Sequence, residues 1–251
     1  MDDLRTRVPG HSLIDELLRH WDLGAIRVDP QTNDVIIDEN AQRCYRDIIG
    51  KRTVGALLAQ LDEGWTVLHS VPVGHGKSDI DHVVIGAPGV FTMAIKFNPG
   101  DDVWVSGRSI SVGGTQQQHV ADTLHEARRA TSYLSLHSGL TVPVVGAIVF
   151  VDPERINLRS PVAGGDNDPE IRVLAQTDLI DSIHGRAVLS QEQVLRIASA
   201  AVQPGTWHEA PQLSSAGSHI AREFEALERA LRSQSETALA QAEWAQAAPA
   251  R

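Results

Sequence analysis

The sequence predicts an α/β protein in which a central mixed sheet is flanked by helices. Between residues 65 and 112, short apolar stretches follow one another at the spacing of hairpins, separated by glycine, proline and aspartate. A long helical pattern comes next. It is followed at once by VPVVGAIVFVD, a nearly continuous apolar run that is typical of a strand covered on both faces. Antiparallel strands, a helix and a buried strand in this order indicate a mixed sheet between helices.

Residues 1–42 are predicted to form a small N-terminal appendage. Apolar side chains recur at helical spacing over residues 13–21, and two short strands are expected around the Pro-Gln-Thr-Asn turn that follows. A second helix is predicted over roughly residues 39–61. Gly50 and Gly55 weaken its middle, because glycine is a poor helix former.

The main domain is predicted over residues 43–207. Its strand-like segments are, in order, WTVLHSVPV, SDIDHVVIGAP, GVFTMAIKF, DVWVSG and RSISVGG. The Ala-Pro-Gly turn after the second segment joins it directly to the third, and the last two segments form a predicted hairpin. A long helix is expected over residues 116–136 before the buried strand.

The end of the domain and the tail of the chain give weaker patterns. Residues 153–170 read as a loop, EIRVLAQ as one more strand, and residues 190–201 as a helix. Residues 208–251 are predicted to be a linker and a C-terminal helix. The apolar stripe of that helix consists of Ile220, Phe224, Leu227 and Leu231. We favour packing of this stripe on the same chain, and a protein partner bound through the helix is the alternative.

Composition limits the function classes. The formal net charge of -10 argues against nucleic-acid binding through a globally positive surface, so DNA contact would need a local basic patch. The single cysteine, Cys44, excludes an internal disulfide and a cysteine-based zinc site. No apolar stretch approaches the roughly 20 residues of a membrane span, and the N-terminus lacks the apolar core of a secretory signal. We therefore expect no membrane association and a cytoplasmic protein.

Several familiar catalytic motifs are absent. The GHGKS sequence at residues 74–78 resembles a phosphate-binding loop, but Val71 stands where that motif needs its first glycine, and a strand follows the lysine instead of a helix. The His125-Glu126 pair does not extend to a zinc-protease motif, because Arg129 replaces the second histidine. No Gly-x-Ser-x-Gly sequence occurs. Nucleotide hydrolysis and covalent hydrolase chemistry are therefore unsupported.

The segment SDIDHVVIGAPGVFTMAIKFNPG carries the most information. Side chains alternate between the faces of a strand, so Asp79 and Asp81 share one face, and Ala94 and Lys96 share one face of the next strand. The tight turn brings the two strands side by side. We expect an aspartate and a lysine to lie within a few ångströms of each other at the open end of the sheet. An ordinary surface salt bridge is the alternative interpretation of this pair.

This segment resembles the core of the nuclease-related domain (NERD) family, which shows a D-I-D-H stretch, a Gly-x-Gly-Val-Phe hairpin and a strand ending in Glu-x-Lys followed by Asn. The matching residues are Asp79, Ile80, Asp81, His82, Gly86, Gly89, Val90, Phe91, Lys96, Asn98, Pro99 and Gly100. LHEARRA, VPVVGAIVFVD and the late Thr-Trp also resemble family members. The similarity extends over approximately residues 48–207.

The resemblance implies a restriction-endonuclease-like core of the PD-(D/E)XK superfamily, in which acids hold Mg²⁺ beside the scissile phosphate of DNA. Such an ion activates water and stabilises the leaving oxygen. By this resemblance Asp81 is the metal-binding aspartate, Asp79 a second metal-binding acid, and Lys96 the catalytic lysine. Asn98 and His82 are accessory candidates.

Two departures from the family pattern bear on activity. Ala94 stands where the family has the glutamate of Glu-x-Lys, and Lys51 follows Gly50 where the family often has a glutamate. Mg²⁺ binding is therefore expected to be weak or absent, unless Asp101, Asp102 or Glu63 supplies a replacement acid.

Our leading hypothesis is a DNA-processing protein whose metal-dependent phosphodiester hydrolysis is weak or lost. The alternative is a non-catalytic module that binds nucleic acid or protein. Action on another phosphate-containing substrate is a third hypothesis, which we hold lower.

Overall fold

A computed structural model describes residues 3–74, 78–160, 162, 168–208 and 217–247, and gives only the backbone of residues 22 and 235–247. The helices are α1 (His11–Asp22), α2 (Glu39–Leu58), α3 (His119–Ser138), α4 (Leu179–Ile183), α5 (Gln191–Ala201), α6 (Pro204–Trp207) and α7 (Gly217–Ala247), with short 3-10 turns η1 (Leu4–Thr6) and η2 (Gln176–Asp178). The middle of the GHGKS sequence, residues 75–77, lies outside the described residues.

The strands form three sheets. They are β1 (Ile26–Val28), β2 (Val35–Ile37), β3 (Thr66–Pro72), β4 (Asp79–Gly86), β5 (Gly89–Phe97), β6 (Asp102–Ser106), β7 (Ser109–Val112), β8 (Thr115–Gln117), β9 (Val144–Val151), β10 (Arg155–Ser160) and β11 (Ile171–Ala175). The main sheet has the order β11-β9-β5-β4-β3. Its strands β3, β4 and β5 are antiparallel, whereas β9 runs parallel to β5 and to β11. The predicted mixed sheet is confirmed.

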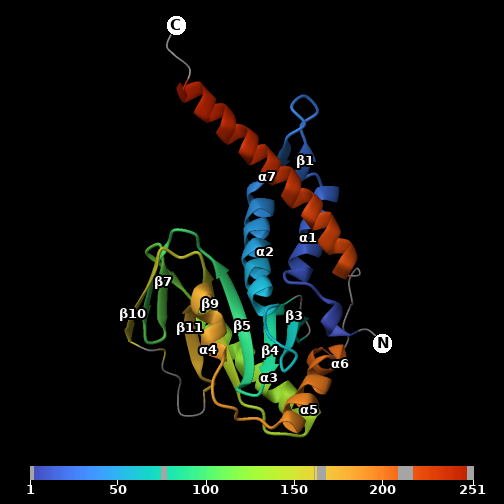
Figure 1. Ribbon diagram of the computed structural model, residues 1–251, viewed down its shortest axis with the longest axis vertical. Coiled ribbons are helices and arrows are strands. Elements are labelled where there is room, and N and C mark those ends of the chain that lie inside the picture. The colour runs from blue at the N-terminus through green and yellow to red at the C-terminus, as the bar shows by residue number, and fades with distance from the viewer. Residues whose placement is uncertain (1–2, 75–77, 161, 163–167, 209–216, 248–251) are drawn as a thin grey trace.

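Helices cover both faces of this sheet (Figure 1). Val83 and Ile85 of β4 pack with the apolar sides of α3 and α5. Val84 points to the other face, where it packs with residues of α2 and α4. This alternation of neighbouring residues is what a strand buried on both faces requires. The expected α/β architecture is therefore present, with the core divided between the two faces.

A second sheet, of order β10-β6-β7-β8, lies beside the main one and departs from the sequence-based expectation. Residues 155–160 were expected in a loop, but they form β10, which pairs in parallel with β6. Residues 115–117, expected partly in a helix, form β8, and α3 begins only at His119. The expected loop was wrong because β10 is an edge strand without a buried residue, so no apolar alternation reveals it.

The two ends of the chain pack together above the sheets (Figure 1). The predicted N-terminal helix and hairpin are α1 and β1–β2, and they contact both α2 and α7. Ile220, Phe224 and Leu227 of α7 are buried in one cluster with residues of α1 and α2. The apolar stripe of the C-terminal helix therefore packs on its own chain, as favoured above. The predicted domain limits at residues 42 and 207 stay predictions, and α2 runs through the first of them.

Both glycines of α2 lie where another part of the chain comes very close. A Cβ on Gly55 would lie 2.3 Å from Pro9 Cγ, and a Cβ on Gly50 would lie 2.9 Å from Phe97 Cβ. These distances are shorter than carbon atoms tolerate, so glycine permits the N-terminal segment and β5 to approach the helix.

Among the described helices, none is both long and apolar enough to cross a membrane.

Candidate functional site: a pocket at the open end of β4 and β5

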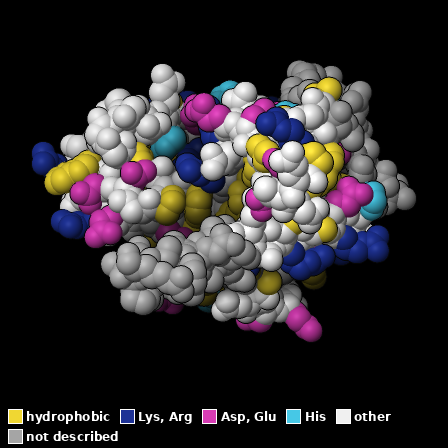
Figure 2. Space-filling view, turned by 90° about the horizontal axis from the view of Figure 1, so that it is seen from above, with side chains coloured by type: hydrophobic (Ala, Val, Ile, Leu, Met, Phe, Trp, Pro, Cys, Tyr) yellow, Lys and Arg dark blue, Asp and Glu magenta, His cyan; other side chains and the backbone are white. Residues whose placement is uncertain are grey.

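A polar pocket of about 460 Å³ opens where β4 begins and β5 ends, and α2, α3 and the second sheet surround it. Its lining residues are Asp47, Lys51, Asp79, Asp81, Ala94, Ile95, Lys96, Phe97, Asn98, Val112, Gln117, His119 and Glu126. The structure thus brings together Lys51, Asp79, Asp81, Ala94, Lys96 and Asn98, whose roles stay predictions. Seen from above the molecule, acidic and basic side chains are interspersed among the coloured residues, without a broad field of one sign (Figure 2).

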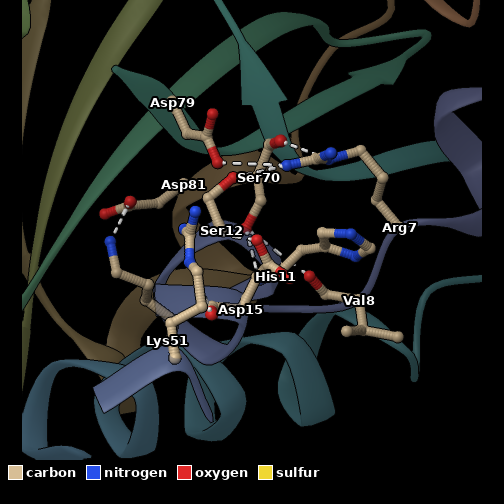
Figure 3. A network of polar contacts seen from close by, with 10 residues as sticks. Arg7, Val8, His11, Ser12, Asp15, Lys51, Ser70, Asp79 and Asp81 are labelled. Carbon is tan, nitrogen blue, oxygen red and sulfur yellow. Dashed lines mark hydrogen bonds and ion pairs between the residues drawn. The ribbon is translucent and has the colours of Figure 1, made fainter. Parts of the chain in front are cut away.

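Asp81 uses both of its carboxylate oxygens within the chain. Oδ1 forms an ion pair with Lys51 Nζ (Figure 3). Oδ2 accepts a hydrogen bond of 2.7 Å from the backbone amide of Ile95. Burial alone would raise the pKa of Asp81, but the charge and hydrogen bond of Lys51 and the Ile95 amide together lower it below its ordinary value. Asp81 is therefore ionised and already neutralised by a lysine.

Asp79 also has a cationic partner, which comes from the N-terminal segment. Arg7 Nη2 lies 3.2 Å from Asp79 Oδ2 and 2.6 Å from Ser12 Oγ, while Arg7 Nε donates to the Ser70 carbonyl at 2.7 Å (Figure 3). Burial raises the pKa of Asp79, against the opposing effects of the Ser12 hydroxyl and the Arg7 charge. Arg7 is itself buried, so the guanidinium is a fixed part of the site.

The N-terminal segment is fastened to β3 beside this contact. Ser70 has a positive φ of 47°, which is uncommon for a residue other than glycine. Its hydroxyl accepts a hydrogen bond of 2.9 Å from the His11 amide and donates a longer one to the Val8 carbonyl. These bonds hold the unusual backbone conformation and place Arg7 beside Asp79. No local signal in the sequence indicates this connection.

Lys96 differs from the other cations of the pocket. Within the described residues no carboxylate lies within ion-pair distance of its ammonium group, whereas Lys51 and Arg7 each have one. Ala94 shares its face and adds no polar atom. Asn98 donates a long hydrogen bond of 3.4 Å to Asp101. The pocket therefore offers one lysine that is available to an anion.

His82 lies on the other face of β4 and does not line the pocket. Its Nδ1 is 2.8 Å from Nδ1 of His69, so one ring donates and the other accepts. Burial lowers the pKa of His82 to about 3 and that of His69 to about 4. Both rings are therefore neutral at physiological pH. His82 packs beside Gly55 of α2, where a Cβ would lie 3.8 Å from its Cε1, so its place is in the packing beneath the helix.

Two acids that the sequence analysis did not select line the pocket instead of the expected replacements. They are Asp47 of α2 and Glu126 of α3, whereas Asp101, Asp102 and Glu63 do not line it. Burial, with a smaller effect of Asp81, raises the pKa of Glu126 to about 7.

Burial also raises the pKa of Asp47, although the positive charges of Lys51 and Lys96 act to lower it. Helical spacing offered a signal for Asp47, which is four residues before Lys51, whereas Glu126 had none.

The residues present do not fit a ready-made divalent metal site. Among the described residues, no group of three or more histidine, cysteine, aspartate or glutamate side chains is arranged to hold a metal ion. Asp79 and Asp81, the two acids expected to bind Mg²⁺, contact Arg7 and Lys51. A hard cation takes its binding energy from anionic oxygens. Here one oxygen of each aspartate is already paired with a cation of the same chain, and the second oxygen of Asp81 accepts from the Ile95 amide.

Comparison with known proteins agrees with the sequence pattern. Residues 46–151 match the family model described as the nuclease-related domain. Neither curated proteins nor solved structures give a significant match. The matched range begins one residue before Asp47 and ends with β9, so it contains the lining residues of the pocket and excludes Arg7. Residues 46–151 of the chain therefore carry a match to the nuclease-related domain (NERD), a family within the PD-(D/E)XK-like nuclease superfamily.

Proposed function

We propose that this protein takes part in DNA processing and that its metal-dependent phosphodiester hydrolysis is weak or lost. The ion pair between Lys51 and Asp81 carries this proposal. Both side chains are largely shielded from solvent, with exposed fractions of 14% and 12%. In this site a fixed lysine ammonium takes the contact that a divalent cation would make with the aspartate.

The energetic argument follows from desolvation. Separating a buried ion pair costs about 3–5 kcal/mol, because each charge is left without its partner. A Mg²⁺ ion that had to displace Lys51 would lose about two orders of magnitude or more in affinity. Ala94 supplies no oxygen to offset that loss. Asp79, beside Arg7, would meet a similar cost.

Incubation of the purified protein with plasmid and single-stranded DNA, in Mg²⁺ or Mn²⁺, tests this proposal. We expect little cleavage above an EDTA control. Asp81→Ala serves as the site variant and Glu63→Gln as a matched acid outside the pocket. Robust cleavage that Asp81→Ala abolishes and Glu63→Gln retains would contradict the proposal, because it would mean that Asp81 still serves a catalytic metal.

A second candidate function is binding of nucleic acid without hydrolysis. Lys96 favours it, since within the described residues this lysine has no carboxylate partner in the pocket. Binding of DNA should then fall steeply with salt and persist in EDTA. Lys96→Ala should weaken DNA binding. Lys51→Ala should weaken it less, because Asp81 already neutralises the Lys51 charge. Absence of any DNA binding at low salt would favour a protein partner instead.

We also propose that the protein resides in the cytoplasm. Cys44 is a free thiol, and burial raises its pKa to about 12, so it is a poor nucleophile and a poor redox sensor. A chain with one unreactive cysteine has no need of an oxidising compartment. Fractionation of cells that express a tagged protein tests this location, and recovery in a secreted or membrane fraction would contradict it.

A further inference from the structure

The outer face of the second sheet carries an exposed tryptophan. Along β6, Val103 and Val105 point inward and are buried, whereas Trp104 between them points outward and is 39% exposed. Trp104 belongs to a central strand of the sheet, with β10 on one side and β7 on the other. A large aromatic ring at this position contributes little to the core, so its exposure needs another explanation.

An arginine and several hydroxyl groups surround this tryptophan. The guanidinium carbon of Arg159, from β10, lies 4.7 Å from the centre of the Trp104 ring. The two side chains line a shallow pocket of about 260 Å³, together with Val105 and three serines, which are Ser106, Ser109 and Ser111. The pocket therefore combines a stacking surface, a cation and hydrogen-bonding hydroxyls within one small area.

The register of the strands extends this surface across the sheet. Trp104 is paired with Ser111 of β7, and Ser111 is paired with Gln116 of β8, so the three side chains lie in one row on the outer face. The amide of Gln116 donates a hydrogen bond of 2.9 Å to Ser109. Hydroxyl and amide groups in such a row can bond to the edges of nucleobases or to phosphate oxygens.

Charge is distributed in favour of an anionic ligand. Residues 102–117 and 155–160, which form this sheet, contain three arginines and one aspartate, giving a formal charge of +3 - 1 = +2 within a chain of -10. Arg108 is paired with Asp168. Arg155 and Arg159 of β10 form no ion pair within the described residues, and both are exposed. Among the described residues, Arg155 and Arg159 thus supply unpaired positive charge along β10, as DNA contact by an acidic chain requires.

We propose that this face, with Trp104 and Arg159 at its centre, binds single-stranded nucleic acid. One base stacks on the exposed Trp104 ring, and Arg159 and the serine hydroxyls contact the adjoining phosphate. Only unpaired bases offer their faces to a ring, so single strands bind in preference to duplex. The inference rests on the DNA-processing role proposed above and adds a binding surface on the sheet that borders the pocket through Val112 and Gln117.

Fluorescence anisotropy with a labelled oligothymidylate of about twelve nucleotides tests the proposal, in EDTA and low salt. The variants are Trp104→Ala, Trp104→Phe and Arg159→Gln, with Trp21→Ala as the control because Trp21 is equally exposed but lies on α1. We expect Trp104→Ala to weaken binding about fivefold or more. Trp104→Phe should restore most of the affinity, and Trp21→Ala should stay within about twofold of the parent protein.

Duplex DNA of the same length should bind more weakly, and Trp104→Ala should change its affinity little. The inference is wrong if Trp104→Ala binds the single strand as the parent does, or if the parent does not bind it at all. Circular dichroism and urea unfolding check that each variant is folded. Loss of binding in Lys96→Ala, with no effect of Trp104→Ala, would overturn this surface and leave the proposed function intact. Robust metal-dependent cleavage would overturn the proposed function and leave this binding surface intact.

Discussion

Lys51 and Asp81 face each other across the pocket, one from a helix and one from a strand, and their charges neutralise one another. The remaining oxygen of Asp81 is bound to the Ile95 amide. The carboxylate is thus held in place and satisfied by the protein alone. This arrangement changes the function that we expect of the D-I-D-H stretch at residues 79–82, from holding a metal to holding the pocket together.

Arg7 should contribute strongly to stability. Arg7→Leu removes the cation beside Asp79 and leaves a buried carboxylate without its partner, which we expect to cost about 3 kcal/mol of unfolding free energy. Urea unfolding at neutral pH measures the effect. The double variant Arg7→Leu with Asp79→Asn should recover part of the loss, because it no longer buries a lone charge. Additive effects of the two changes would show that the pair does not interact.

Gly55→Ala should destabilise the protein although alanine is the better helix former. The propensity gain is about 1 kcal/mol, but the new Cβ would collide with Pro9, and such overpacking costs about 1–3 kcal/mol. Thermal unfolding compares this variant with Gly55→Ala in a Pro9→Ala background, where the obstacle is gone. A stabilised single variant would mean that the N-terminal segment yields easily and is not held against α2.

Glu126 should make stability depend on pH. The pKa of Glu126 in the folded state, about 7, lies above the ordinary value of 4.5. Between pH 4.5 and about pH 7, Glu126 is therefore protonated in the folded state and ionised in the unfolded state. The resulting stabilisation is complete below about pH 4.5 and is lost as the pH rises through about 7. We expect Glu126→Gln to be more stable than the parent protein at about pH 8, by an amount on the order of 1–3 kcal/mol.

The buried His69 and His82 pair acts in the opposite direction. Their lowered pKa values favour the folded state above about pH 6.5, and this contribution is lost as the pH falls toward 4. The comparison of Glu126→Gln with the parent protein must therefore be made at each pH, so that the histidine contribution cancels. Equal pH profiles for the two proteins would show that Glu126 does not titrate as its burial suggests.

Much of the fold and part of the site could be predicted from the sequence. Alternation along two adjacent strands and the short turn between them suffice to bring Asp81 and Lys96 to one pocket, since register follows from so tight a connection. The expected close contact between an aspartate and Lys96 is not formed among the described residues, because Asp81 pairs with Lys51 and Asp79 with Arg7. The family pattern also drew attention to Lys51. These elements could be predicted because the pattern of polar and apolar residues within each segment is sufficient to identify it.

The rest depends on contacts between distant parts of the chain. Arg7 meets Asp79 across 72 residues of sequence, and neither residue has a neighbour that signals the other. β10 was missed because its pairing with β6 is made by backbone groups, while none of its residues is buried. Glu126 borders the apolar stripe of α3, where only the packed structure distinguishes a pocket residue from a surface one.

A titration with Mn²⁺ tests the central claim most directly, because it asks whether Lys51 takes the place of a metal at Asp81. The proteins compared are the parent, Lys51→Met and Lys51→Arg, with binding followed by Mn²⁺ electron paramagnetic resonance and by the metal-dependent rise in unfolding temperature. We predict weak binding by the parent and by Lys51→Arg. Lys51→Met should bind Mn²⁺ at least about tenfold more tightly than the parent does. Bound Mn²⁺ should also restore the stability that this variant loses when Asp81 is left without its cation. Equally tight Mn²⁺ binding by the parent and Lys51→Met, abolished by Asp81→Asn, would contradict the claim.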